Sequence, residues 1–315
     1  MAELHVVFGA SGGAGGALVR ALAAQGKEVR AVSRSPADLP MGVVGVRADA
    51  LDPRATLEAT KGATVVYHCV NVPYAQWDEQ LPRVMDNLVA AAANANATLV
   101  YMDNLYMYGL PTGPMTESTP EAATSRKGKL RSRLAARLLE RHEAGEVRAT
   151  IARASDFFGP GAANTLAGQL VFPAIASGRK AHWIGSLDQP HSLNYIDDVA
   201  RDLITLGTDE RALGSIWHLP PQPPLTAREF IQAAFEAAGR PPSIGVYPRW
   251  MVRIAGLFDR QMREVLEIMY QFEHPFILDG SRFESSFSSG PTPLPEALAA
   301  TVAAHRNGSN RRQRG

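Results

Sequence analysis

A glycine-rich loop near the N-terminus constrains the fold more than any other feature. The apolar run Leu4 to Phe8 leads directly into residues 9–16, GASGGAGG, after which Ala and Leu recur at helical spacing. Missing Cβ atoms let such a loop turn sharply and approach a pyrophosphate, which the first helical turn binds through free N–H groups. With a second strand at Val29 to Ser33, this predicts a nucleotide-binding βαβ unit rather than a merely structural turn. The loop residues expected at the cofactor are Gly9, Ser11, Gly12, Gly13, Ala14 and Gly15.

Strands and helices continue to alternate up to about residue 160. Further strands are predicted at Val43 to Val46, Thr64 to Val70, Thr98 to Met102 and Val147 to Ala152, with helices after Pro53, at Gln76 to Asn94 and at 127–144. Such repeats predict an α/β fold, a Rossmann-type doubly wound parallel sheet with its ligand at the carboxyl ends of the strands.

The alternation breaks down in the second half. Helices are predicted near 164–177, 196–207, 226–238 and 248–271. We therefore divide the chain into an NADP-binding core (1–160), a smaller substrate-binding lobe interleaved with it (161–304) and a disordered basic tail (305–315). The lobe residues Trp183 and Arg179 suit a sugar nucleotide and a flat aromatic compound equally well.

The residues after the second strand indicate which dinucleotide binds. Folds of this kind that use NAD carry an acidic residue about 20 positions beyond the glycines, where it accepts from the ribose 2′-OH. Here that position holds Ser33 followed by Arg34. A guanidinium binds a 2′-phosphate that a carboxylate would repel, so NADP (NADPH) is favoured over NAD, with Arg34 as its clamp. The alternative is a solvated loop arginine.

Composition excludes several classes of function. The chain has 315 residues, 45% hydrophobic and 20% charged, and a formal net charge of +1, which argues against a nucleic-acid partner. No apolar run approaches the roughly 20 residues that span a bilayer, and no signal peptide precedes the first strand, so no membrane partner and a cytoplasmic location are expected. No ligand spacing supports a metal site, and the single Cys69 excludes an internal disulfide.

Several segments carry a resemblance to a known family. Besides the glycine loop, these are Asp49 in RADA, the run VYMDNLYMYG (100–109), RASDFFGP (153–160), NYIDDVA (194–200) and LDGSR (278–282). The chain resembles the extended short-chain dehydrogenase/reductase family, also called the NAD-dependent epimerase/dehydratase family. The resemblance implies an oxidoreductase or epimerase. It implies that Asp49 contacts the adenine, and that Ala50, Val70, Ala154, Ser155 and Lys129 also lie at the cofactor.

The chain departs from that family's catalytic pattern. Family members use a serine after the fifth strand and a Tyr-x-x-x-Lys on the next helix, and no such motif occurs in this sequence. The serine position holds Asn104, preceded by Asp103. The family's spacing puts Lys129 at the tyrosine position and Arg133 at the lysine position. Lys129 as acid and Asn104 as donor to a carbonyl are one hypothesis. The alternative places Lys129 and Arg133 on a solvated basic face with Lys127 and Arg131.

Other residues are candidates for the missing acid or base. Tyr106 follows the fifth strand, where a phenol could restore the proton relay or simply pack. Asp103 and Asp156 are strand-end carboxylates that could serve as base. His191 is expected to cap the interface between the lobes rather than face the cleft.

Three functions remain open from the sequence. The first is an NADP-dependent oxidoreductase or epimerase of a small-molecule substrate with an altered acid–base set. The second is a dinucleotide-binding sensor without turnover, and the third a non-redox isomerase or cyclase using the same cleft. A homodimer through the helix that carries Trp77, Leu81 and Leu88 is a further expectation.

Overall fold

A parallel sheet forms the centre of the protein. The computed structural model describes residues 3–312, and in them seven strands pair in the order β11-β6-β5-β4-β1-β2-β3. Each neighbouring pair is parallel. The predicted doubly wound Rossmann-type sheet is therefore confirmed, with β11 as a seventh strand that the sequence did not reveal. The strands of this sheet are β1 (Leu4–Phe8), β2 (Glu28–Ser33), β3 (Val44–Arg47), β4 (Val65–His68), β5 (Thr98–Asp103), β6 (Arg148–Arg153) and β11 (Ile216–His218).

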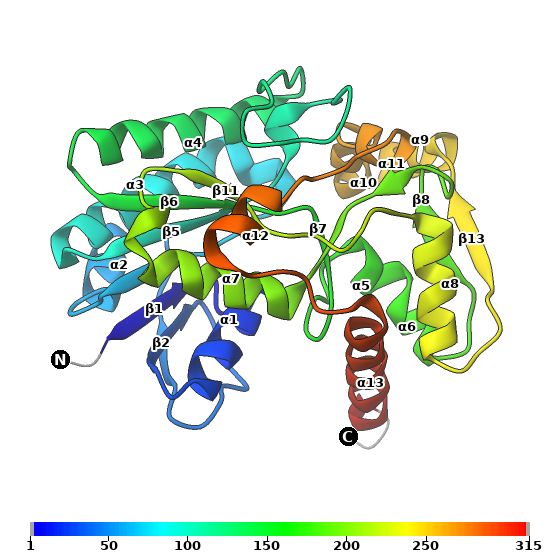
Figure 1. Ribbon diagram of the computed structural model, residues 1–315, viewed down its shortest axis with the longest axis horizontal. Helices are drawn as coiled ribbons and strands as arrows, with labels where there is room; N and C mark the ends of the chain where they lie inside the picture. The colour runs from blue at the N-terminus through cyan, green and yellow to red at the C-terminus, as the bar shows by residue number, and fades with distance from the viewer. Residues whose placement is uncertain (1–2, 313–315) are drawn as a thin grey trace.

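Helices cover both faces of this sheet, as Figure 1 shows. One face carries α2, α3 and α4, and the other carries α1, α7 and α12. Side chains of β1 alternate between the two cores, with Val6 and Phe8 on the α3 side and Val7 on the α1 side. The helices are α1 (Gly13–Ala24), α2 (Pro53–Ala59), α3 (Trp77–Ala95), α4 (Arg126–Glu143), α7 (Ile196–Thr208) and α12 (Ser281–Phe287), with short 3₁₀ turns η1 (Tyr74–Gln76), η2 (Tyr106–Tyr108) and η3 (Glu210–Ala212).

The strand order fixes where a ligand can bind. From β1 the chain runs outward to β2 and β3 and then crosses back to β4 on the other side of β1. The loops after β1 and β4 therefore leave in opposite directions and open a crevice at the carboxyl edge of the sheet. The glycine loop follows β1 and lies at this crevice.

The remaining elements form a smaller second lobe beside that edge (Figure 1). Its core gathers aromatic side chains that include Phe158, Phe172, Trp183 and Phe230. Its elements are β7 (Asp156–Phe158), α5 (Leu166–Leu170), α6 (Phe172–Ala176), β8 (Ala181–Ile184), β9 (Pro190–His191), β10 (Leu193–Tyr195), β12 (Leu225–Thr226), α8 (Ala227–Ala237), β13 (Ile244–Tyr247), α9 (Arg249–Phe258), α10 (Arg260–Leu266), α11 (Tyr270–Glu273) and α13 (Leu294–Arg312).

Two of the predicted helices are interrupted. The expected helix 248–271 is split into α9, α10 and α11, and the first break comes at Asp259, which adopts an extended backbone with φ −122° and ψ 116°. The expected helix 164–177 is divided at Val171, ahead of Pro173 near the start of α6. Both breaks turn the chain around the cleft, so they shape the substrate side of the molecule.

The C-terminal segment differs from expectation. We expected a disordered tail over residues 305–315, but residues 305–312 continue α13, and residues 313–315 lie outside the described residues. The first turns of α13 bury Ala297, Leu298 and Val302 in the core of the second lobe. A helix anchored in this way extends readily, because each added residue costs less than nucleation.

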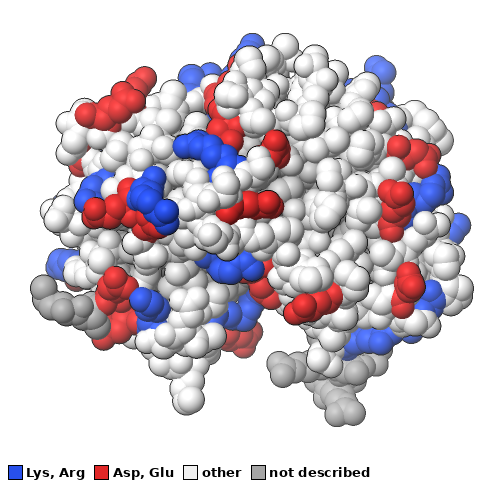
Figure 2. All heavy atoms as spheres, in the orientation of Figure 1, with Lys and Arg blue, Asp and Glu red and all other residues white. Residues whose placement is uncertain are grey.

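Charges are mixed over the surface. Figure 2 shows basic and acidic side chains interspersed on the face that it presents, without a broad patch of one sign. Among residues 3–312, no helix is long and apolar enough to cross a membrane. The same residues contain no group of three His, Cys, Asp or Glu side chains arranged to hold a metal ion.

Candidate active site

One continuous cavity runs from the glycine loop to the second lobe. It has a volume of about 1000 Å³ and is lined by the carboxyl ends of β1, β2, β4, β5 and β6 and by residues of α9, α10 and α11. This is large enough for a dinucleotide and a small second ligand. We call the part of the cavity next to the glycine loop its cofactor half. The part lined by the second lobe is its substrate half.

The glycine loop needs its glycines for close packing. Gly9 has φ +81°, and a Cβ there would lie 2.4 Å from the carbonyl oxygen of Cys69. A Cβ on Gly15 would lie 2.3 Å from the carbonyl oxygen of Gly9. Gly12 caps α1 without a side-chain hydrogen bond, so the N–H groups of the first turn stay available to an anion.

Most residues expected at the cofactor line this cavity. They are Gly9, Ser11, Gly12, Gly13, Ala14, Ser33, Arg34, Asp49, Ala50, Val70, Ala154 and Ser155. Gly15 does not line it, and its place is the contact between α1 and the loop. Lys129 is also absent from the lining, and its side chain is exposed to solvent.

Two buried hydroxyl groups in the lining have no partner. Neither the Oγ of Ser33 nor that of Ser155 makes a hydrogen bond to any described residue. Buried polar groups are nearly always satisfied, so both hydroxyls face a position that a polar ligand fits. Beside Ser33, the exposed Arg34 forms no ion pair with any residue in the range 3–312. Its guanidinium is free to meet an anion.

The basic residues of α4 that face the protein interior are not the ones expected from the sequence. Lys129 and Arg133 are exposed on its outer face, so their assignment to catalysis is wrong. Lys127 and Arg131 are buried instead, with exposed fractions of 1% and 5%. The reason is the apolar stripe of Leu130, Leu134 and Leu138, which packs on the sheet and carries positions 127 and 131 inward.

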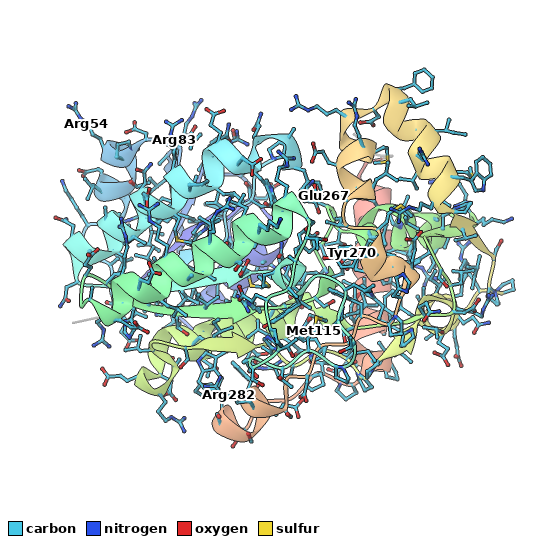
Figure 3. The ribbon with its side chains drawn as sticks, turned by 90° about the horizontal axis from the view of Figure 1, so that it is seen from above. Arg54, Arg83, Met115, Glu267, Tyr270 and Arg282 are labelled. Atoms are coloured by element: carbon cyan, nitrogen blue, oxygen red, sulfur yellow. The ribbon has the colours of Figure 1, made fainter. Side chains whose placement is uncertain are left out.

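Lys127 is held by two glutamates. Its Nζ contacts Glu264 and lies 2.5 Å from Glu267 Oε2, and its backbone N–H donates to Glu267 Oε1 at 2.9 Å. Figure 3 shows Glu267 beside the end of α4. Lys127 also lies over the ring of Tyr74, 5.2 Å from its centroid. These contacts tie the segment 264–267 of the second lobe to the core next to the cavity.

Arg131 and Asp103 belong to a buried network. Arg131 donates to Tyr101 Oη at 2.7 Å and to Asp103 Oδ1 at 3.3 Å, and it stacks over Trp77. Arg153 lies 3.5 Å from Asp103 Oδ2. Burial raises the pKa of Asp103 and the two guanidiniums oppose that rise. Asp103 lines the cavity, but its carboxylate is held between Arg131 and Arg153. This arrangement suits a residue that holds its neighbours in position better than one that removes a proton from a substrate.

Tyr106 forms a pair with Tyr74 inside the cavity. Their hydroxyl oxygens lie 2.8 Å apart, and Trp77 stacks on Tyr106. Burial raises the pKa of Tyr106 well above its usual value, and the neighbouring Tyr74 and Asp156 raise it further. Burial likewise raises the pKa of Tyr74. Both phenols are therefore neutral near pH 7 and can act as hydrogen-bond or proton donors.

Asn104 lies beside this pair. Its Oδ1 accepts a hydrogen bond from the backbone N–H of Tyr106 at 3.1 Å, which fixes the amide. The Nδ2 group donates to no described residue, and Asn104 lines the cavity. Asn104 can thus offer an N–H to a ligand oxygen, as expected from the sequence.

Asp156 and His191 form a hydrogen-bonded pair next to the cavity. His191 Nδ1 lies 3.0 Å from the carbonyl oxygen of Gln271, and its Nε2 lies 2.8 Å from Asp156 Oδ2. Asp156 lines the cavity, whereas His191 is buried behind it against Trp183, Phe272 and Phe276 of the second lobe, and not at the interface between the lobes as expected.

Sequence reasoning missed Tyr74 and Gln271. Both line the cavity, and Gln271 Nε2 is buried without a partner among the described residues. Tyr74 lies on η1 and Gln271 on α11, and both segments are too short to show a helical period. The positions of Lys127 and Arg131 could have been found, because they share the helical spacing of Leu130 and Leu134.

Two further expectations are corrected. Trp183 and Arg179 do not line the cavity, and Trp183 is buried in the core of the second lobe. Trp77, Leu81 and Leu88 are each at most 2% exposed and pack inside the chain, so a homodimer through α3, which stays a prediction, would have to use other residues of that helix.

Comparison with known proteins agrees with this geometry. A family model described as "NAD dependent epimerase/dehydratase family" matches residues 5–216. No curated protein sequence matches the chain.

Solved structures match nearly the whole chain, at identities that indicate the fold alone. UDP-glucose 4-epimerase of Thermus thermophilus, in complex with NAD, has 19% identity and a TM-score of 0.78 over 96% of this chain and 99% of its own. dTDP-glucose 4,6-dehydratase of Bacillus anthracis, also with NAD, has 14% identity and a TM-score of 0.80 over 98% of each chain. UDP-glucuronic acid 4-epimerase of Bacillus cereus, with UDP-glucuronic acid and NAD, has 16% identity and a TM-score of 0.77 over 96% of this chain and 99% of its own.

Proposed function

The chain belongs to the NAD-dependent epimerase/dehydratase family, and we propose that it is an NADP(H)-dependent oxidoreductase of a small molecule that carries a carbonyl or hydroxyl group. Membership of this family makes it an enzyme that uses a nicotinamide dinucleotide. The preference for NADP, the chemistry at the substrate and the acid–base residues are the proposal.

The observation that carries the proposal is the set of unsatisfied groups around the glycine loop. The free first-turn N–H groups of α1 suit a pyrophosphate, and the partnerless hydroxyls of Ser33 and Ser155 suit further polar atoms of the cofactor. Asp49 also lines the cavity, and its carboxylate can accept from an adenine amino group. These residues fit a dinucleotide.

Arg34 supports NADP over NAD. It lies in the lining next to Ser33, is exposed and forms no ion pair within the described chain. A free guanidinium beside a buried hydroxyl offers a bidentate contact and an O–H donor to a 2′-phosphate. An acidic residue, which would select a bare ribose, is missing at positions 33 and 34.

The proton chemistry is assigned to Tyr106. When bound, the nicotinamide supplies or accepts the hydride that interconverts a carbonyl and an alcohol. Tyr106 exchanges the accompanying proton with the substrate oxygen, and Tyr74, 2.8 Å away, restores it. Asn104 Nδ2 polarises the same oxygen. Asp103 and Arg131 keep Trp77 and the Tyr106 loop in place through their stacked and hydrogen-bonded contacts.

The experiment that tests this function is turnover of NADPH with a panel of ketones and aldehydes. Wild type is compared with Tyr106→Phe and with the exposed control Lys129→Met. Oxidation of NADPH that Tyr106→Phe abolishes and Lys129→Met leaves intact supports the oxidoreductase. Cofactor binding without any turnover would instead indicate the dinucleotide-binding sensor, and product formation without a change in the cofactor would indicate the non-redox isomerase or cyclase.

A further inference from the structure

The substrate half of the cavity is walled by apolar side chains. They come from β8, from α9, α10 and α11, and from the segments next to α11, and include Ile184, Val252, Val265, Ile268, Phe272 and Phe276. Four of them, Val252, Ile268, Phe272 and Phe276, are at most 6% exposed. Because these residues belong to the second lobe, the apolar surface lies across the cavity from the glycine loop.

Positive charge is nearly absent from this cavity. Among the described lining residues, only Arg34 and Arg131 are cationic. Arg34 lies at the cofactor end, and Arg131 is already engaged by Asp103, Tyr101 and Trp77. No lysine or arginine is therefore left in the described lining to bind phosphates at the substrate end.

Such a wall does not fit the ligands of the structural neighbours. UDP-glucuronic acid, which the Bacillus cereus structure contains, carries a diphosphate. Burying a diphosphate without cations or several N–H donors is strongly unfavourable, and proteins normally supply arginine or lysine for it. An uncharged, mostly apolar ligand instead gains free energy from each apolar group that it buries here.

Several polar groups of the lining lie together around Tyr106: the hydroxyl of Tyr74, the amides of Asn104 and Gln271, and the carboxylate of Asp156. The other polar lining residues toward the second lobe are uncharged and include Asn164, Thr165, Gln169 and Tyr247. An apolar pocket with a few convergent polar groups orients a ligand by one functional group. That group is the one on which Tyr106 would act.

We propose that the substrate is an uncharged, predominantly apolar ketone or alcohol, and not a nucleoside diphosphate sugar. Its oxygen meets Tyr106 and Asn104, and its hydrocarbon part lies against α9, α10 and α11. Reduction adds one hydride to the carbonyl carbon and one proton to its oxygen, which gives the alcohol. This proposal rests on the function proposed above and adds the substrate class.

The test is calorimetric binding to the full-length protein saturated with NADP⁺, which prevents reduction of a ketone. The probes are 2-butanone, 2-hexanone, 2-octanone and UDP-glucose. Each methylene added to the ketone is expected to tighten binding by about fourfold until the cavity is filled. UDP-glucose is expected to bind more weakly than 2-octanone.

A matched pair of variants on α9 locates the binding. Ala255 lines the cavity, whereas Leu257 does not line it and is 72% exposed. Ala255→Asp should weaken binding of 2-octanone by about tenfold or more, because the ketone would have to desolvate a carboxylate. Leu257→Asp should leave it unchanged. An unaltered affinity of both variants for NADP⁺ shows that they are folded.

Two results would overturn the proposal: tighter binding of UDP-glucose than of 2-octanone, or ketone affinities that do not depend on chain length. Failure of NADP⁺ to bind is a separate outcome, which removes the proposed function. In that case the ketones and UDP-glucose are titrated against the protein without cofactor. Their relative affinities then still show which class of ligand the apolar half binds.

Discussion

The hydroxyl oxygens of Tyr74 and Tyr106 lie 2.8 Å apart, although the residues are 32 positions apart in the sequence. Tyr74 follows β4 and Tyr106 follows β5, and these strands are neighbours in the sheet. Their carboxyl ends thus bring two phenols together inside the cavity. Burial raises the pKa of both, so both phenols keep their protons near pH 7, as the proposed role of Tyr106 as proton donor requires.

Removal of the Tyr106 hydroxyl should stop turnover. We expect Tyr106→Phe to lower kcat by about 100- to 10,000-fold, the usual contribution of a general acid. Tyr74→Phe should have a smaller effect, because Tyr106 keeps its own proton. Steady-state kinetics with NADPH measures both, and the NADPH dissociation constant should change in neither variant. Equal activity of Tyr106→Phe and wild type would rule out this role.

Lys127 and Lys129 should differ in their effect on stability. Lys127→Met leaves Glu264 and Glu267 without their buried cation, and we expect a loss of about 3 kcal/mol in the free energy of unfolding. Lys129→Met changes an exposed residue and should stay within about 0.5 kcal/mol. Urea denaturation at pH 7 compares the two. A larger effect at residue 129 would contradict the inward placement of Lys127.

Acid should destabilise the fold through His218. Burial, and then the charge of Arg153, lower the pKa of His218 to about 4. Its Nε2 lies 2.6 Å from Tyr108 Oη, and its Nδ1 faces the backbone oxygens of Met115 and Asp279, a setting for a neutral ring. The unfolded chain binds this proton at higher pH than the folded chain does, so stability is full above about pH 6.5 and falls toward pH 4.

The expected loss from this one group is about 3 kcal/mol. His68, also buried, contributes in the same direction. Urea unfolding of wild type and His218→Gln at pH 7 and pH 4.5 isolates the share of His218, because all other groups are common to both proteins. Identical pH dependence of the two proteins would contradict the assignment.

The sequence predicted the sheet, and the position of the glycine loop at the carboxyl edge of that sheet, for a physical reason. Both depend on local patterns: apolar strands alternating with helices, and glycines whose spacing is set by the approach of α1 to β1. The cofactor-binding roles of Ser33, Arg34 and Ser155 stay predictions, although their side chains line the cavity.

The catalytic half could be predicted only in part. Tyr106 and Asn104 follow a strand that the sequence revealed, whereas Lys129 and Arg133 were chosen by matching a motif rather than by the helical period of Leu130 and Leu134. Tyr74 and Gln271 lie on the short segments η1 and α11, which reach the cavity only through tertiary packing. The β11 strand has three residues, too few for a periodic signal.

The most direct test of the account is calorimetric titration of NADPH and NADH against wild type, Arg34→Ala and Arg54→Ala. Arg54 is an exposed arginine on α2 that does not line the cavity (Figure 3), so it is the matched control. We predict that wild type and Arg54→Ala prefer NADPH, and that Arg34→Ala loses about 10- to 100-fold in affinity for NADPH with little change for NADH. Equal binding of both nucleotides to wild type would contradict the NADP preference, and binding of neither would contradict the cofactor site itself.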